Sequence, residues 1–433
     1  MNDPAHDHRR SSRMAGLIGN VMEWYDFALF GYFAPFISDL FFPGGGGLSS
    51  LLATWGIFAG GFLMRPVGAV LFGTIGDRIS RRRVLVLSVV LMVVPTFTLG
   101  LIPTFSAIGV AAPILLTLVR LIQGLSVGGE FSGSVTYMVE TAPANRRGWA
   151  GSWANVGSMG GMLLGSGLAS LVTTLLPTPA VQSWGWRLPF LLGAALGIYA
   201  YTQVRQLHES HMTHREQTHR ARSPLHEALT RDRWKTIQAV LFASGYGVIF
   251  YIPLVYLPDY INRFTDMALA IAMQINTVAT VLIMGLVPVT AWISDRWVPR
   301  RYLIAGAFAV MAALSALLFG LLQTGATGAV AAAQLVFAVL IAVPLGVAPA
   351  LLVELFHRVD RLTGYSIAYN IGLGVVGGTT PMVVTALIET LGTPYAPAFY
   401  LMGWAIVATV ALLFMRPAMV STPESAVFDA PSP

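Results

Sequence analysis

The sequence contains no cysteine and few charged residues, and each shortage excludes a class of protein. Without cysteine there are no disulfides, no thiolate metal sites and no thiol redox chemistry. Only 11% of the 433 residues are charged, whereas 55% are hydrophobic, and the mean hydropathy is +0.68. A soluble core of this size cannot bury so much apolar surface. The sequence therefore predicts a protein whose main solvent is lipid.

The apolar residues fall into runs that are long enough to cross a membrane. A helix needs about 20 apolar residues to span a hydrocarbon layer of about 30 Å. Because lipid offers the backbone no hydrogen-bond partner, and because the ten-residue alternation of a barrel is lacking, these runs predict an all-α membrane protein. We expect twelve spans, near residues 15–42, 51–74, 84–101, 107–139, 150–176, 189–204, 237–260, 268–293, 303–322, 329–355, 363–391 and 396–415.

The basic residues indicate the topology. Of the 26 Lys and Arg residues, Arg65 and Arg120 fall inside spans, Arg187 and Arg263 fall in connections on one side, and the other 22 lie on the opposite side. By the positive-inside rule the second side is cytoplasmic and holds both termini. We therefore attribute the sequence pI of about 9.7 to topology and not to nucleic-acid binding. The polar N-terminus lacks a small-residue cleavage site, which predicts that the first helix is retained.

The longest polar segment divides the spans six and six. The predicted organisation is a cytoplasmic tail (1–13), an N-terminal bundle (14–204), a cytoplasmic linker (205–235), a C-terminal bundle (236–416) and a second cytoplasmic tail (417–433).

The two halves also repeat each other in sequence. The loop around Asp77 returns around Asp295, an offset of 218 residues, and Glu140 returns as Glu354, an offset of 214. Nearly equal offsets predict two six-helix repeats of the same membrane orientation, with a cavity between them.

Several charged residues are expected inside the membrane. Glu23 and Asp26 are three residues apart in the first span, hence on one helical face, and the fourth span carries Arg120 and Glu130. Each charge near a helix centre costs about 2.5–3.5 kcal/mol, so these groups must pair or face a wet cavity. We predict that Glu23, Asp26 and Glu130 carry protons and that Arg120 is a counter-ion or a substrate anchor. The alternative is an ion-pair lock that only ties helices together.

Other polar residues at mid-span are candidates for lining the cavity, because a buried polar group needs a partner. The predicted substrate-binding residues are Asn20, Arg120, Gln123, Trp153, Tyr251, Tyr369 and Asn370. Arg65 precedes Pro66 near the cytoplasmic end of its span, and we expect it to snorkel or to brace its helix.

The loop after the second span combines an aspartate with three arginines. Carboxylate and guanidinium groups at a helix end lock neighbouring helices through charge-assisted hydrogen bonds and release them when the bundles rock. The predicted gating residues are Asp77, Arg78, Arg81, Arg82, Glu140 and Arg147.

Five motifs resemble the metabolite:proton symporter group of the major facilitator superfamily. They are Gly-Asn-x-x-Glu-Trp-Tyr-Asp-Phe at 19–27, Met-Arg-Pro at 64–66, the Asp77 loop, the segment 120–130 and the segment 184–190. The resemblance implies two six-helix bundles, alternating access and proton-coupled uptake of a carboxylate or zwitterion such as citrate, 2-oxoglutarate, shikimate, proline or betaine. Segments 148–167 and 251–260 look most like the proline/betaine branch.

The second half departs from the family pattern. It carries Val298 and Pro299 in its loop, and His357 replaces the proline usual after Glu-Leu-Phe. These departures put the second-half brace in question but not the fold.

The predicted function is therefore uptake of a small organic acid or zwitterion by proton symport across a bacterial inner membrane. Partners are the substrate, protons and membrane lipids, with no nucleic acid and no cofactor or metal, and the protein is expected to be a monomer. No metal cluster, nucleophile triad or phosphate loop is placed at bilayer depth, so an enzyme is not predicted. Two alternatives stay open: a proton-coupled exporter or antiporter of the same fold, although the fifth span lacks a Gly-Pro pair, and a non-transporting membrane sensor.

Overall fold

A computed structural model describes residues 19–44, 47–76, 81–126, 130–205, 233–357 and 361–415. Helices make up almost all of this part of the chain, as expected for a backbone that must satisfy its own hydrogen bonds in lipid. Residues 19–32 are helical. The elements that follow are α2 (Ala34–Phe41), α3 (Gly47–Gly76), α4 (Arg81–Leu101), α5 (Phe105–Ile108), α6 (Ala111–Ser126), α7 (Glu130–Glu140), η1 (Ala144–Arg146), α8 (Arg147–Leu175), α9 (Thr178–Ala180), η2 (Val181–Gly185), α10 (Arg187–Arg205), α12 (Arg233–Tyr251), η3 (Ile252–Tyr256), α13 (Leu257–Phe264), α14 (Leu269–Arg296), α15 (Arg300–Gln323), α16 (Thr327–Leu355), α17 (Arg361–Ile367), η4 (Ala368–Gly377), α18 (Gly378–Leu391) and α19 (Ala396–Phe414).

These helices account for the expected membrane spans. Among the described residues, nine helical stretches are long and apolar enough to cross a bilayer. The third span is represented by a shorter apolar stretch, Val86–Leu101. Residues 19–32 with α2, and α10, occupy the positions of the first and sixth spans. The predicted all-α membrane fold is confirmed, while most of the predicted linker lies outside the described residues.

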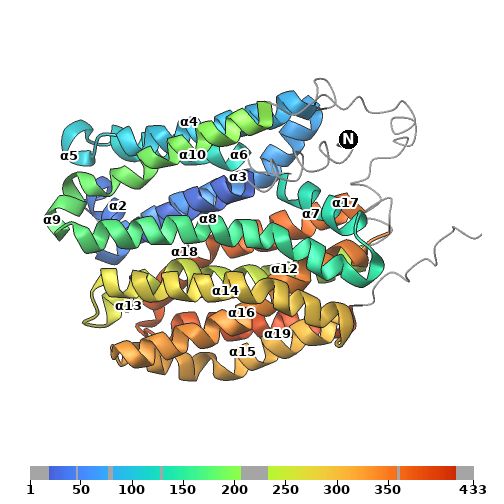
Figure 1. The fold of residues 1–433 in the computed structure, drawn as a ribbon. Helices are drawn as coiled ribbons and strands as arrows, with labels where there is room; N and C mark the ends of the chain where they lie inside the picture. Colours follow the sequence, from blue (N-terminus) through green and yellow to red (C-terminus); the bar gives the residue numbers. More distant parts are fainter. Residues whose placement is uncertain are drawn as a thin grey trace, which may run out of the picture.

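The helices lie side by side, and each half of the chain forms one bundle (Figure 1). Within the N-terminal bundle α3 packs on α6 and α4 on α10, and within the C-terminal bundle α15 packs on α19 and α14 on α16. The bundles meet along two seams, where α8 packs on α14 and α3 on η4 and α18. A site between the bundles therefore has walls from both halves of the sequence.

Two spans of the C-terminal bundle change from α-helical to π-helical geometry partway along. They do so at η3 in the seventh span and at η4 in the eleventh. Pro258 of α13 lies four residues after Leu254 of η3. Because proline has no N–H, it cannot donate the α-helical hydrogen bond to the Leu254 carbonyl. π-helical turns often lie at functional sites. Both segments lie at the seam that faces the N-terminal bundle.

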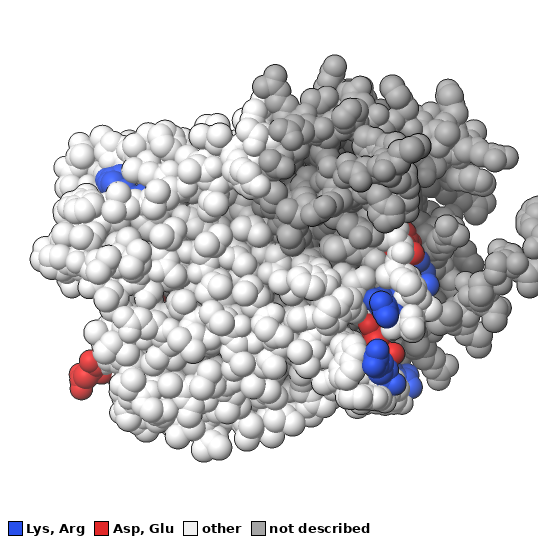
Figure 2. Space-filling model, in the orientation of Figure 1, with Lys and Arg blue, Asp and Glu red and all other residues white. Residues whose placement is uncertain are grey.

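The visible surface is mostly uncharged (Figure 2). Its basic and acidic side chains gather chiefly at one end, which contains the ends of α7, α14 and α16 and the start of α8 (Figures 1 and 2). Exposed apolar side chains such as Val94, Leu171 and Val278 cover the flanks. A charged end beside an apolar flank matches the expected orientation, with the charged end in the cytoplasm.

Candidate transport site

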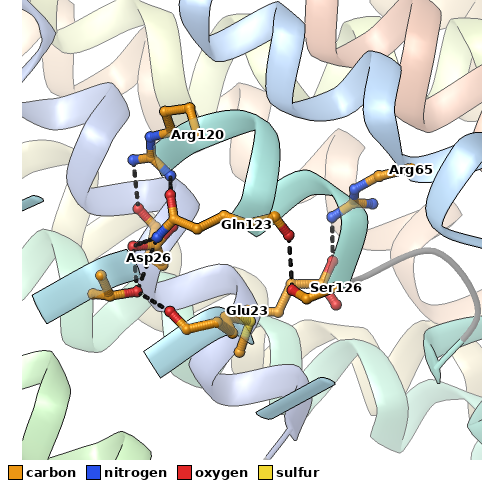
Figure 3. Close-up of polar contacts among 8 residues, drawn as sticks. Glu23, Asp26, Arg65, Arg120, Gln123 and Ser126 are labelled. Carbon is orange, nitrogen blue, oxygen red and sulfur yellow. Dashed lines mark hydrogen bonds and ion pairs between the residues drawn. The ribbon is translucent and has the colours of Figure 1, made fainter. Parts of the chain in front are cut away.

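Asp26 and Arg120 form the centre of a buried polar cluster in the N-terminal bundle (Figure 3). Arg120 Nη1 donates to Asp26 Oδ2 at 2.5 Å and to Gln123 Oε1 at 2.9 Å. Gln123 Nε2 donates to Asp26 Oδ1 at 2.9 Å, and the Thr96 hydroxyl lies 2.9 Å from the same oxygen. Asp26 has no exposed surface and Arg120 is 1% exposed. Asp26 and Arg120 are thus paired, as expected for charges inside the membrane, and Gln123 bonds to both of them.

Close helix packing places these groups together. A Cβ added to Gly124 of α6 would lie 1.9 Å from the carbonyl oxygen of Gly61 in α3, so only glycine permits this approach. Residues 120 and 123 are about one turn apart, which puts both side chains on the face toward Asp26. The Arg120 guanidinium also lies over the ring of Phe30, 4.0 Å from its centroid.

Glu23 forms a second buried ion pair, with Arg65 of α3. Glu23 is 3% exposed and Arg65 is 1% exposed. The guanidinium lies over three aromatic rings: 4.6 Å from the centroid of Phe62, 5.0 Å from Phe27 and 6.0 Å from Trp24. Of the two expectations for Arg65, snorkelling is therefore wrong, whereas a bracing role agrees with its ion pair to the first span. Its charge stays inside because a carboxylate and the faces of aromatic rings replace water.

The two pairs face different parts of the molecule. Arg120 contacts residues of the N-terminal bundle, namely Asp26, Gln123 and Phe30. Arg65 lies at the seam instead, because a Cβ built on Gly374 of η4 would be 3.6 Å from Arg65 Cδ. Phe62 is also at the seam, with its ring centroid 5.3 Å from that of Tyr251.

The other predicted substrate-binding residues divide between buried and exposed positions. Asn20 and Tyr251 are buried, and their side-chain polar atoms have no protein partner within the described part of the chain. Tyr369 stacks on Phe131 with centroids 4.6 Å apart, and Asn370 donates to the Ser366 carbonyl at 3.0 Å.

Trp153 does not belong to this site. It is 44% exposed and packs edge-on against Trp149, which is 39% exposed. Leu164 and Leu171 continue the same exposed stripe along α8. The prediction that Trp153 lines the cavity is therefore wrong, because its indole shares the outer apolar face of the helix.

Several predicted residues lie outside what the structure describes. Asp77 and Arg78 are outside the described residues, as are the side chains of Arg81, Arg82 and Glu130. Their predicted roles in gating and in proton transfer stay predictions.

The cytoplasmic ends of the bundles are joined by ion pairs that cross between the two sequence repeats. Arg361 of α17 pairs with Glu140 of α7 at 2.9 Å, and Arg147 of α8 lies 3.9 Å from Glu354 of α16. Each of these two carboxylates therefore has an arginine partner across the seam.

Asp295 completes this cytoplasmic contact. Its two carboxylate oxygens accept hydrogen bonds from the backbone N–H groups of Gly148 (2.9 Å) and Trp149 (2.8 Å) at the start of α8. Arg300 pairs with Asp295 at 2.8 Å and with Glu354 at 2.9 Å. A carboxylate at a helix N-terminus is favourable because unpaired N–H groups and the helix dipole point toward it. The second-half brace is therefore formed despite Val298 and Pro299.

The opposite end of the seam carries an uncharged hydrogen-bond cluster, which the sequence analysis did not predict. Tyr32 of the first span donates to the Leu254 carbonyl of η3 at 2.9 Å. Asn276 of α14 donates to the Tyr32 hydroxyl at 2.9 Å and to the Leu254 carbonyl at 3.2 Å. Gln334 of α16 donates to Asn276 Oδ1 and to the Pro253 carbonyl, each at 2.8 Å. We call this set, the side chains of Tyr32, Asn276 and Gln334 with the carbonyls of Pro253 and Leu254, the outer cluster.

Comparisons with known proteins agree with this geometry. The model of the family described as sugar (and other) transporter matches residues 13–239 and 202–424. The chain belongs to this transporter family. The glycine betaine/proline/ectoine/pipecolic acid transporter OusA of Dickeya dadantii is 32% identical over 418 residues, which cover 94% of this chain and 83% of that one. The ectoine/proline transporter ProP of Corynebacterium glutamicum is 34% identical, covering 92% and 82%. The proline/betaine transporter of Salmonella typhimurium is 31% identical, covering 94% and 83%.

Solved structures share the fold of this transporter. A crystal structure of a D-xylose-proton symporter superposes with a TM-score of 0.74 at 18% identity, covering 94% of this chain and 97% of that one. A partially occluded, inward-open structure of the xylose transporter XylE from E. coli gives a TM-score of 0.74 at 17% identity, covering 96% and 100%. The major facilitator fold, the multi-pass location in the bacterial inner membrane and the resemblance to proline/betaine transporters are thereby confirmed.

Proposed function

We propose that this transporter couples the entry of a proton to the uptake of a small zwitterionic solute. The observation that carries the proposal is the presence of two buried carboxylate–guanidinium pairs along one helix, Glu23 with Arg65 and Asp26 with Arg120. Burial disfavours the charge of each carboxylate, while its arginine favours it, so a change of partner changes whether the carboxylate holds a proton. This is the arrangement that a proton-coupled carrier requires.

The relatives support the choice of substrate class. Their names give proline, betaine, ectoine and pipecolic acid as substrates. Each of these molecules joins a carboxylate to a positively charged nitrogen group. An arginine that exchanges its own carboxylate for that of the substrate would recognise the first feature, and aromatic rings around the same arginine would recognise the second.

The membrane potential makes such uptake energetically useful. A zwitterion that enters with one proton carries one net positive charge inward. That charge gains about 2.3 kcal/mol per 100 mV. Because about 1.4 kcal/mol corresponds to a factor of ten, a potential of about 100 mV alone can support an accumulation of about 40-fold.

Transport into proteoliposomes tests the proposal. The panel contains glycine betaine, proline and ectoine as zwitterions, with citrate and 2-oxoglutarate as organic anions, and either a pH gradient or a potential is imposed. We expect accumulation of a zwitterion that responds to both gradients and is abolished by a protonophore. Accumulation of the anions alone would contradict the substrate class. Counterflow that responds to neither gradient would contradict proton coupling. Gradient-driven extrusion from loaded vesicles would favour the exporter.

A further inference from the structure

Several buried polar atoms near the Glu23–Arg65 pair have no protein partner in the described part of the chain. They are both side-chain polar atoms of Asn20, the indole Nε1 of Trp24, Nε of Arg65 and the hydroxyl of Tyr251. All four side chains are at most 3% exposed. Buried donors and acceptors that lack partners are rare in native structures, and each needs an explanation. Here one such side chain, Arg65, belongs to the ion pair, and the other three lie near it.

Contacts place these side chains on one site. Trp24 follows Glu23 directly, and its ring lies 6.0 Å from the Arg65 guanidinium and 6.3 Å from the ring of Tyr251. Phe62 closes the space between them, with Arg65 4.6 Å and Tyr251 5.3 Å from its centroid. Asn20 lies one helical turn before Glu23. The walls come from both bundles, as alternating access requires of a substrate site.

Arg120 is less suited to receive a substrate. Its terminal nitrogens bond to the Asp26 carboxylate, the Asp26 carbonyl and Gln123, and within the described part of the chain its Nε, like that of Arg65, has no partner. All of these partners belong to the N-terminal bundle, and none lies across the seam. Arg65 has one carboxylate partner and lies against η4 of the opposite bundle.

We propose that Arg65, and not Arg120, binds the substrate carboxylate, and that Trp24, Phe62 and Tyr251 enclose the positively charged nitrogen of the same zwitterion. The proposal rests on the proposed function and names the groups that perform it. Protonation of Glu23 makes its side chain neutral and releases Arg65, and the substrate carboxylate then takes the place of Glu23. On the cytoplasmic side the substrate leaves, Glu23 loses its proton and the Glu23–Arg65 pair forms again. One proton and one zwitterion cross together, so each cycle moves one net positive charge inward, and the Glu23–Arg65 pair is restored at its end.

Removal of the guanidinium tests the carboxylate contact. Binding of glycine betaine and of choline, which shares the trimethylammonium group but lacks the carboxylate, is measured on the purified full-length protein. Losing one partner of a desolvated charge pair costs a factor of about 30 or more. We expect Arg65→Gln to weaken betaine binding by that factor and to abolish the preference over choline, and Arg65→Lys to restore part of both. Arg187→Gln, which removes an arginine at the start of α10, should leave both affinities unchanged.

Neutralisation of the carboxylate gives an independent test that does not depend on the stability of the Arg65 variants. Glu23→Gln imitates the protonated state and leaves Arg65 without a carboxylate. We expect Glu23→Gln to bind betaine with an affinity that no longer varies with pH, and betaine to raise its Tm by more than it raises that of the wild type. Glu389→Gln, which removes an exposed carboxylate from α18, should retain the pH dependence of binding.

Paired tryptophan variants test the aromatic wall. Trp24→Leu should weaken betaine binding about tenfold through loss of the cation–π contact. Trp153→Leu removes a tryptophan of the same size from the outer face of α8 and should have no effect on affinity.

The outcomes separate this proposal from the proposed function. Wild-type affinity in Arg65→Gln, or unchanged pH dependence in Glu23→Gln, would overturn the assignment of Arg65 while leaving zwitterion transport intact. A wild-type protein that binds no zwitterion would overturn both.

Discussion

The outer cluster predicts that one hydroxyl group controls how often the extracellular end of the seam opens. Tyr32 belongs to the N-terminal bundle, whereas Leu254 and Asn276 belong to the C-terminal bundle, so both hydrogen bonds of the Tyr32 hydroxyl must break when the bundles part. In Tyr32→Phe the ring remains and the two bonds are lost. The Leu254 carbonyl keeps its bond from Asn276, which limits the number of unsatisfied groups.

The size of the effect follows from these two bonds. A neutral hydrogen bond contributes about 0.5–1.5 kcal/mol net, so two contribute about 1–3 kcal/mol. At about 1.4 kcal/mol per factor of ten, the population that is open to the outside should rise about 5- to 140-fold. Transport kinetics should change as well, but accessibility reports the population most directly.

Cysteine labelling measures that population, because the natural chain contains no cysteine to interfere. Val255→Cys is a suitable reporter. Val255 is 2% exposed, and its Cγ1 lies 2.5 Å from a Cβ built on Gly31 of the opposite bundle. In a Val255→Cys background, Tyr32→Phe should raise the rate of reaction with a membrane-impermeant maleimide by about the factor above.

A second tyrosine supplies the control. Tyr25 is also fully buried, and its hydroxyl donates to the Pro189 carbonyl at 2.5 Å, but both groups belong to the N-terminal bundle. Tyr25→Phe should destabilise the fold slightly without changing the labelling rate. Equal rates in Tyr32→Phe and its parent would refute the idea that the outer cluster holds the seam closed, and equal acceleration by both variants would attribute the effect to general loosening.

Three further predictions concern stability and the cytoplasmic end. Asp26→Asn leaves the buried Arg120 guanidinium without a carboxylate, so the variant should lose about 3–5 kcal/mol of stability, seen as a lower Tm in detergent, and an unchanged Tm would contradict the buried pair. Gly124→Ala should cost about 1–3 kcal/mol because its methyl group would overlap the Gly61 carbonyl, whereas Gly133→Ala, which meets nothing within 4 Å, should be neutral or stabilising in the same assay. Asp295→Ala should increase the accessibility of the cytoplasmic end more than tenfold, because two backbone N–H groups and Arg300 lose their shared carboxylate. Glu140→Ala should change this accessibility less than about fivefold, because the Glu140–Arg361 pair is more exposed. The reverse order of the two effects would contradict the assignment of Asp295 as the main contact.

The Asp26 cluster could be predicted from the sequence because the features that indicate it lie within single spans. The cost of charge in lipid marks Asp26 and Arg120 as residues that need partners, and helical spacing adds Gln123 to the same face. The partner of Glu23 was missed because Arg65 is 42 residues away and lies near Pro66, where a snorkelling side chain would also be placed. Only the packing of α3 against the first span decides between these positions.

The outer cluster could not be predicted, because it depends on backbone geometry. The Leu254 carbonyl becomes an acceptor for Tyr32 in a π-helical segment, and period-based analysis treats such a segment as an ordinary helix. The prediction that Trp153 lines the cavity was wrong for a simpler reason. A single sequence does not show which side of a glycine-rich helix faces lipid.

The two repeats differ at one buried position in a way that bears on how such carriers diversify. Gln334 lies 214 residues after Arg120, the same offset that relates Glu140 to Glu354. The N-terminal repeat therefore has a charged group where the C-terminal repeat has an amide. In the described spans of the C-terminal bundle, ionisable acidic and basic groups such as Asp259, Asp295 and Glu354 lie toward the ends. Energy input and ligand choice are thus partly modular. Mutations in the C-terminal repeat can reshape its side of the seam without altering the two buried ion pairs of the first span, and hybrid carriers that exchange this repeat should keep their ion coupling while acquiring new substrates.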